Sequence, residues 1–151
     1  MILTCFIFLL TACKNSTYYH SFQPVHNTGW EKCDTLIYNL PSPIPIGSYE
    51  IQIGVRHFAS YKYKDLWIEI SHNLTDNHSL NIDTLNITLA DEKGDWLGHG
   101  IGGVIQYTNK EKHVLSITDS IEQPAFKIIH LMDEVPLKGV YDMGIQLNRV
   151  P

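Results

Sequence analysis

Short apolar runs with a period of two residues, separated by turn residues, restrict the fold of this sequence more than any other feature. Tyr49, Ile51, Ile53 and Val55 share one face of such a run, and the residues between them are polar or glycine. Because successive side chains of a strand point to opposite faces, this alternation predicts a half-buried β-strand. The runs are rich in Ile, Val, Tyr, Thr and Trp, which favour strands. Runs of this kind span residues 34–40, 48–58, 66–74, 83–90, 103–108, 113–118, 126–132 and 140–147.

The segments between these runs carry the Gly, Pro, Asn and Asp residues that are typical of turns. No segment has the pattern of a capped amphipathic helix of ordinary length. About eight short strands at such spacing are typical of a sandwich of two antiparallel sheets. The sequence therefore predicts an all-β fold, a single-domain β-sandwich with a jelly-roll-like topology.

Length and charge narrow the class of protein further. The chain has 151 residues, of which 44% are hydrophobic, so it is long enough for one folded domain with one core. The formal net charge is -5, and Lys and Arg form no cluster. Because binding to a phosphate backbone depends on clustered basic residues, we exclude nucleic acid as a partner.

The N-terminal segment MILTCFIFLLTAC is apolar and ends in small residues before a cysteine. About ten apolar positions are too few for a membrane-spanning helix, which needs roughly 20, and they fit the core of a signal peptide. Leu10, Thr11, Ala12 and Cys13 resemble the lipobox of bacterial lipoproteins, in which the cysteine is lipidated and becomes the new N-terminus. We expect a signal peptide over 1–12, a polar linker over 13–29 after lipidated Cys13, and the β-sandwich over 30–151. The alternative is that residues 1–12 form an N-terminal strand of a cytosolic protein.

The three cysteines agree with export. Cys5 would leave with the signal peptide and Cys13 would carry the lipid, so Cys33 would have no partner for a disulfide within the mature chain. A lone cysteine at the start of an apolar run is typical of a small buried side chain. We therefore expect Cys33 in the core.

The segment GHGIGG at residues 98–103 formally fits the G-x-G-x-x-G pattern of dinucleotide-binding loops. That site needs a helix after the glycines, so that the pyrophosphate meets a helix N-terminus. Here the glycines precede the predicted strand VIQYT. We interpret the segment as a tight, close-packed connection in which the chain adopts positive φ.

Catalytic and metal-binding patterns are not found. The sequence has no H-E-x-x-H, C-x-x-C or G-x-S-x-G motif, and its eight histidines are scattered. Asp91, Glu92 and Asp95 cluster in one turn and could offer oxygen ligands to calcium, but we favour a solvated turn. We predict no catalytic residue, metal or cofactor, and no nucleophile and base can be paired for a hydrolase.

The order of several short motifs resembles the gliding-motility lipoprotein family GldH of the Bacteroidota. The resemblance covers nearly the whole mature chain, in the segments YKDLWIEI, DTLNITLAD, GDWLGHG and IIHLMDEVPLKGVYDMGIQL. Asp133 is a departure, because the family tends to place an Arg after the preceding Met. The family-motif residues in this sequence include Trp67, Asp91, Trp96, Gly98, Gly139, Asp142 and Gly144.

This resemblance implies a membrane-anchored, non-catalytic accessory lipoprotein of the cell envelope, associated with gliding motility and the type IX secretion machinery. The implied partners are the membrane, through acyl chains on Cys13, and other envelope proteins of a motility or secretion complex. The polar segment after Cys13 lacks the acidic cluster that often directs such lipoproteins to the cell surface. We therefore expect an outer membrane lipoprotein on the periplasmic face.

Three tripeptides of the form Asp-Ser/Thr-apolar resemble the O-glycosylation signal of exported proteins in these bacteria. The candidate hydroxyls belong to Thr35, Thr84 and Ser120. Such tripeptides also arise where strands begin, so the pattern alone leaves both explanations open.

A carbohydrate-binding module on a lipid anchor is the alternative function. Jelly rolls use exposed aromatic side chains as platforms for sugars, and a glycan would then be the ligand. The available rings are those of Trp30, Trp67, Trp96, Tyr61 and Tyr63. This alternative requires that they lie on the surface, whereas tryptophan in a sandwich also belongs to the core.

Overall fold

A computed structural model describes residues 17–75, 79–111 and 113–151 of the chain. The described residues contain ten strands and no helix, which confirms the all-β prediction. The strands are β1 (Thr17–Pro24), β2 (Leu36–Asn39), β3 (Gly47–Phe58), β4 (Asp65–His72), β5 (Asn81–Thr88), β6 (His99–Ile101), β7 (Val104–Thr108), β8 (His113–Ile117), β9 (Ala125–His130) and β10 (Val140–Val150).

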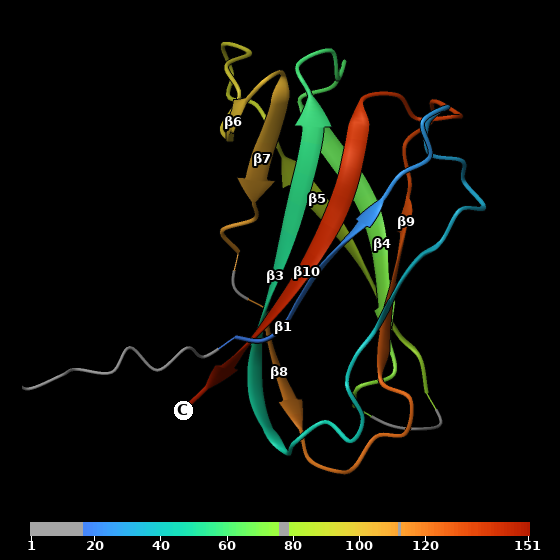
Figure 1. The fold of residues 1–151 in the computed structure, drawn as a ribbon, viewed down its shortest axis with the longest axis vertical. Coiled ribbons are helices and arrows are strands. Elements are labelled where there is room, and N and C mark those ends of the chain that lie inside the picture. The colour runs from blue at the N-terminus through green and yellow to red at the C-terminus, as the bar shows by residue number, and fades with distance from the viewer. Residues whose placement is uncertain (1–16, 76–78, 112) are drawn as a thin grey trace, which may run out of the picture.

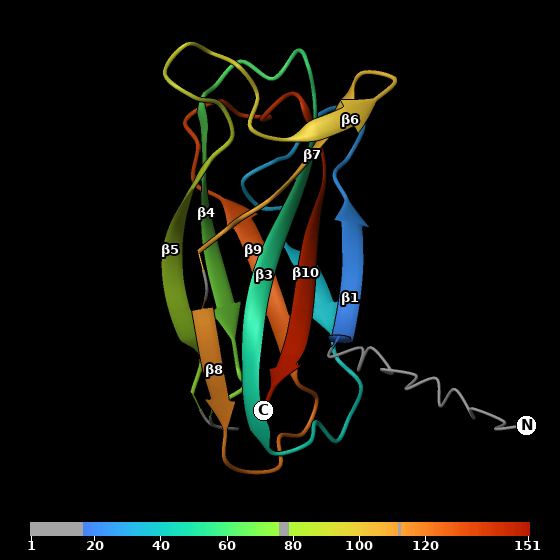
Figure 2. The same cartoon turned by 90° about the vertical axis from the view of Figure 1, so that its left-hand side faces the viewer.

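Two antiparallel sheets form the two layers of the molecule (Figure 1). The first has the strand order β1-β10-β3-β7-β6, and β8 pairs with the lower part of β3, on the same side of it as β7. The second has the order β2-β9-β4-β5. Turned by 90°, the molecule shows β5 and β4 of the second sheet to the left of β3 and β10 of the first (Figure 2).

The hydrophobic core lies between the two sheets. Tyr49 and Val55 of β3 are fully buried, as are Ile68 of β4 and Phe126 of β9. The hydroxyl of Tyr38 in the second sheet donates a hydrogen bond of 2.8 Å to the carbonyl of Met143 in the first sheet. The alternation predicted for residues 49–55 is therefore confirmed, because the apolar side chains of this run face the core.

Each of the eight predicted runs contains a strand, and two further strands were not predicted. One is β6, which forms a hairpin with β7 through Gly102 and Gly103 at φ 71° and 86°. A Cβ atom on Gly100 would overlap the carbonyl oxygen of Val104, so the interpretation of residues 98–103 as a tight, close-packed connection is confirmed. The jelly-roll-like connectivity stays a prediction.

The expected linker over 13–29 differs from the structure, because residues 17–24 form β1 and pair with β10. This strand is at the edge of its sheet, and none of its residues is fully buried. Tyr18 and Tyr19 are neighbours in the sequence and both pack partly against the core, so β1 lacks the strict alternation that identifies the other strands. Within the described part of the chain, no helix is long and apolar enough to cross a membrane.

The expectation for Cys33 is wrong, because its side chain is exposed. Cys33 lies in a turn before β2, and the neighbouring Trp30 is the residue that this segment buries. The apolar run that follows enters the core only from Leu36 onward.

Candidate functional site

The outer face of the first sheet carries a row of apolar side chains near the end of β3 and the starts of β7 and β10. These strand ends lie at the upper end of the molecule in Figure 1. Phe58 pairs with Val104 of β7, which in turn pairs with Ile101 of β6. Paired residues point to the same face of a sheet, so these three side chains lie side by side. Tyr141 of β10 extends the row, with its ring 5.5 Å from that of Phe58 in an edge-on contact.

This apolar row, Phe58, Ile101, Val104 and Tyr141, is open to solvent. Ile101 is 97% exposed, Tyr141 46% and Phe58 40%. Single exposed apolar residues are ordinary, but neighbouring ones across four strands are typical of a surface that binds another molecule. Aromatic side chains next to an arginine are also the composition that protein interfaces favour.

Arg56 and Asp142 form an ion pair directly below the apolar row. Two contacts of 2.7 Å join the guanidinium to the carboxylate, from Nη2 to Oδ2 and from Nε to Oδ1. Asp142 is buried, whereas the Arg56 side chain is one-third exposed. Burial raises the pKa of Asp142, and the contact with Arg56 opposes that rise. This bidentate ion pair holds β3 and β10 together at the base of the apolar row.

Phe22 of β1 covers two glycines next to this ion pair. Gly54 and Gly144 are paired between β3 and β10, and Gly144 is also paired with Phe22. Added Cβ atoms would come within 2.9 Å of the Phe22 ring at Gly54 and 2.6 Å at Gly144. The Arg56 guanidinium lies 4.1 Å from the centre of the same ring. The family-motif residues Asp142 and Gly144 thus belong to one packed cluster.

We expect Gly144→Ala to lower the free energy of unfolding by about 1 to 3 kcal/mol, the range typical of overpacked sites. The new methyl group would displace the Phe22 ring and disturb its contact with Arg56. Urea denaturation measures the effect. Adding Phe22→Leu should recover part of the loss, because the smaller side chain leaves room. Unchanged stability of Gly144→Ala would show that Phe22 does not pack on this glycine.

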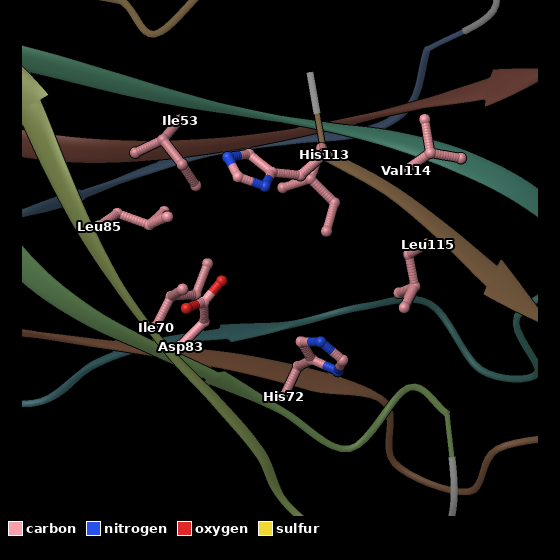
Figure 3. A pocket seen from close by; sticks show the side chains of 9 residues that line it. Ile53, Ile70, His72, Asp83, Leu85, His113, Val114 and Leu115 are labelled. Atoms are coloured by element: carbon pink, nitrogen blue, oxygen red, sulfur yellow. The ribbon is translucent and has the colours of Figure 1, made fainter. Parts of the chain in front are cut away.

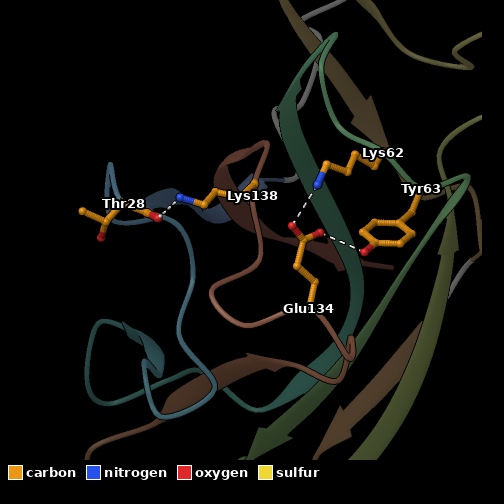
Figure 4. A network of polar contacts seen from close by, with 5 residues as sticks. All are labelled: Thr28, Lys62, Tyr63, Glu134 and Lys138. Atoms are coloured by element: carbon orange, nitrogen blue, oxygen red, sulfur yellow. Dashed lines mark hydrogen bonds and ion pairs between the residues drawn. The ribbon is translucent and has the colours of Figure 1, made fainter.

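A network of polar contacts links three loops at the upper end (Figure 4). The Glu134 carboxylate accepts hydrogen bonds from the Tyr63 hydroxyl at 2.8 Å and from Lys62 Nζ at 3.2 Å. These two donors lower the pKa of Glu134. Lys138 Nζ donates to the carbonyl of Thr28 at 2.9 Å. Loops 59–64, 131–139 and 25–35 are thereby tied together.

Two buried histidines lie among aromatic rings below these loops. His57 is fully buried, with ring centres 4.5 Å from Trp96 and 5.7 Å from Tyr61. His130 is also buried, with its ring 5.3 Å from that of Trp30. Burial lowers the pKa of both histidines, and it has the same effect on His72 in β4. They are therefore neutral in the folded protein at pH 7.

We expect stability to fall as the pH drops below about 6.5, the ordinary histidine pKa. The unfolded chain takes up protons there, whereas folded His57, His72 and His130 take them up only at lower pH. Because their pKa values are lower in the folded state, these histidines contribute their full stabilisation above this pH. The stabilisation is lost as the pH falls further. Denaturation curves between pH 8 and pH 5 test this, and His130→Gln should make the dependence shallower. Equal stability at pH 7.5 and pH 5.5 would contradict it.

The other family-motif residues have structural positions. Asp91 Oδ1 accepts the backbone N–H groups of Lys93 and Asp95, at 2.8 and 3.0 Å, and so closes the 91–95 turn. Gly139 has φ +90°, and a Cβ there would come within 2.8 Å of Tyr61. Gly98 directly precedes β6. Sequence reasoning found these positions but missed Arg56 and Phe22. Arg56 is a cation in a predicted strand, and Phe22 is an aromatic residue in the segment expected to be the linker.

The proposed sugar platforms differ in accessibility. Trp30 and Tyr61 are buried and Tyr63 and Trp96 are half-buried, whereas Trp67 is 44% exposed on the outer face of the second sheet. Of the five aromatic candidates, only Trp67 therefore offers a largely open ring.

The candidate modification sites can be placed only in part. Thr35, Thr84 and Ser120 are all exposed, so a glycosyltransferase could reach their hydroxyls. Cys13 lies outside the described residues. Among the residues that are described, no group of three or more His, Cys, Asp or Glu side chains is placed to hold a metal ion.

The fold and this surface define a two-sheet, all-β domain with an exposed apolar row. The family model described as GldH lipoprotein matches residues 17–147, and the chain belongs to this family. A gliding motility lipoprotein GldH homolog from Christiangramia forsetii is 22% identical over 154 residues, covering 95% of this chain and 90% of the relative. No solved structure gives a significant match. The resemblance drawn from the sequence is confirmed, and the family is one of gliding motility lipoproteins rather than a known enzyme family.

Proposed function

We propose that this protein is a non-catalytic accessory lipoprotein of a motility or secretion complex, anchored by acyl chains on Cys13 to the periplasmic face of the outer membrane. The observation that carries the proposal is the family match over 17–147, because it spans the two sheets from the first residue of β1 to Leu147 in β10. The lipobox before Cys13 supports the anchor, and the family's association with gliding supports the link to the type IX secretion machinery.

The position of β1 supports a close tether to the membrane. Four residue steps separate Cys13 from Thr17, so the sheet would begin at most about 14 Å from the lipidated cysteine. Thr17 pairs with Asn148 near the end of β10, whereas Tyr141 of the apolar row lies near its start. Seven residues of strand correspond to roughly 23 Å. An anchored protein would therefore hold the apolar row away from the bilayer, where another envelope protein can reach it.

Anchoring also explains how a surface as small as the apolar row could be sufficient to bind a partner. Confinement to one membrane raises the effective concentration of neighbouring proteins, so weak contacts become productive. The row has a hydrophobic centre, with Arg56 beside it as a polar contact. We assign the row to a protein partner because its side chains are apolar and aromatic rather than amide-rich.

Fractionation and motility assays test the anchor and the role together. In a gliding strain that lacks the gene, the wild-type protein should sediment with outer membranes and restore colony spreading. Cys13→Ala should remain in the soluble periplasmic fraction and restore little spreading. Cys33→Ala is the matched control, because Cys33 is an exposed free cysteine. Full spreading by soluble Cys13→Ala would refute the need for the anchor.

O-glycosylation forms a separate part of the proposal. The hydroxyls of Thr35, Thr84 and Ser120 are exposed, which supports modification of at least one of them. Intact-mass measurement on the protein from its native host should show a hexose-containing addition beyond the acyl chains. A mass that accounts for acyl chains alone would rule the modification out.

Sugar binding remains a second candidate because of one observation. The exposed ring of Trp67 lies beside Asn86, its cross-strand neighbour on the outer face of the second sheet. An aromatic face with an adjacent amide is a suitable platform for a sugar ring. A glycan array read with tryptophan fluorescence separates the two functions: a sugar that quenches the wild-type emission but not that of Trp67→Ala favours the module, and no binding removes it.

A further inference from the structure

The two sheets separate at one side of the sandwich and leave an apolar slot of about 140 Å³ (Figure 3). Ile51 and Ile53 of β3, Ile70 of β4, Leu85 of β5 and Leu115 of β8 form its walls. The side chains of His72, Asp83 and His113 lie around its mouth. The slot opens between β8 of the first sheet and β5 of the second, at the opposite side of β3 from β10.

Both strands that border the slot have an unpaired edge. Among the described residues, β8 pairs only with β3, and β5 pairs only with β4. An unpaired edge presents backbone N–H and C=O groups that can pair with a further strand. The slot and the two edges therefore occur together, which is the arrangement that binds an extended peptide by strand addition.

The two edges differ in how well they are protected. Asp83 places a carboxylate on the inward face of β5, and inward-pointing charges are a common protection of edge strands. β8 has the sequence HVLSI, without Asp, Glu, Lys, Arg, Pro or Gly. Its Val114 is 61% exposed beside the slot. The edge of β8 is thus the one open to a new strand.

The size and charge of the slot restrict the side chains that it would accept. A cavity of about 150 Å³ lined by aliphatic residues is large enough for benzene, so this slot suits one Leu, Ile or Phe side chain. Asp83 Oδ1 accepts the N–H of Thr84 at 2.8 Å, and among the described residues no cation is paired with this carboxylate. A basic side chain two positions from the apolar one would lie on the same side of an added strand and reach Asp83.

We propose that the free edge of β8 binds an extended segment of a partner protein by strand addition, with one bulky apolar side chain in the slot and a Lys or Arg beside Asp83. Main-chain hydrogen bonds to β8 supply affinity, and the slot with its carboxylate supplies sequence preference. This site goes beyond the proposed accessory function, because it shares no residue with the apolar row and does not depend on the lipid.

Selection of random heptapeptides displayed on phage against the purified mature protein tests this proposal. Enriched peptides should alternate apolar and polar residues, with Leu, Ile or Phe two positions from Lys or Arg. Synthetic peptides of those sequences should slow amide hydrogen exchange over residues 113–117. Asp83→Asn should weaken the basic peptides several-fold while binding their uncharged counterparts equally well.

Val114→Lys is the decisive variant, because an edge charge blocks strand addition while an exposed position leaves the core intact. It should weaken peptide binding at least tenfold, whereas Val114→Thr should retain it, and unchanged near-ultraviolet circular dichroism would verify both folds. Enrichment of no common sequence, equal binding by Val114→Lys, or exchange protection elsewhere would overturn the proposal. So would a dimer of the free protein that Val114→Lys dissociates, since the occupant would then be a second copy. Each of these failures leaves the tests of Cys13 and the apolar row unaffected.

Discussion

Trp30→Ala is expected to lower the free energy of unfolding by about 3 to 5 kcal/mol, the usual cost of deleting a buried tryptophan. The Trp30 side chain is fully buried, and its Nε1 donates a hydrogen bond of 2.8 Å to the carbonyl of Asp34. Its backbone pairs with that of Leu137 in both directions and joins loop 25–35 to loop 131–139, and its ring packs 5.3 Å from that of His130. Chemical denaturation followed by circular dichroism measures the loss.

Trp67→Ala is the matched control for this prediction. The Trp67 ring is 44% exposed, so its removal should cost less than about 1 kcal/mol, as is usual for surface substitutions. Similar losses for the two variants would contradict the assignment of Trp30 to the core and Trp67 to the surface. Fluorescence of the two variants gives an independent check, because the buried ring should emit at shorter wavelength.

Asp142→Ala is expected to cost about 2 to 3 kcal/mol, because it removes two hydrogen bonds to a charged group and leaves Arg56 without its anion. This loss is at or below the lower end of the range of about 3 to 5 kcal/mol for breaking a buried ion pair, because the Arg56 side chain is one-third exposed. The Phe22 ring and the base of the apolar row should loosen as well, because the guanidinium lies against that ring. Urea denaturation of the two proteins gives the difference.

A double-mutant cycle with Arg56→Met isolates the ion pair. Once Arg56 is replaced, Asp142→Ala should cost clearly less than it does in the wild type, because the carboxylate no longer has its partner. The stability of Asp142→Asn should lie between that of the wild type and that of Asp142→Ala, since the amide keeps the volume and one acceptor. Strictly additive losses would mean that the two side chains do not stabilise each other.

The sequence predicts the strands of this fold well where an apolar stripe faces the core. Residues 49–55 show this best, because every second position in this part of β3 is apolar and faces the core. β1 and β6 were not predicted, since β1 is fixed by pairing with β10 and β6 is a three-residue strand made by a glycine turn. Cys33 was misplaced for a related reason: the burial of its segment depends on Trp30 packing against a distant loop.

The surface was harder to predict than the fold. Arg56 and Asp142 are 86 residues apart in the sequence, and only the pairing of β3 with β10 brings them together. Ile101 and Phe58 become neighbours through β7, which lies between their strands. The motif residues Asp142 and Gly144 could be identified from the sequence, but their shared contact with Phe22 and Arg56 requires the register of three strands.

Crosslinking in native membranes tests the central claim most directly, which is that the apolar row holds a partner of the cell envelope. Tagged wild-type protein, Phe58→Ser/Tyr141→Ser and the control Trp67→Ser would be crosslinked in cells, purified and analysed by mass spectrometry. All three replaced side chains are exposed, so the folds should be preserved. Motility or secretion components should copurify with the wild type and with Trp67→Ser, and should be lost from the double variant. Recovery of the same components with the double variant, or of none of them with the wild type, would contradict this account.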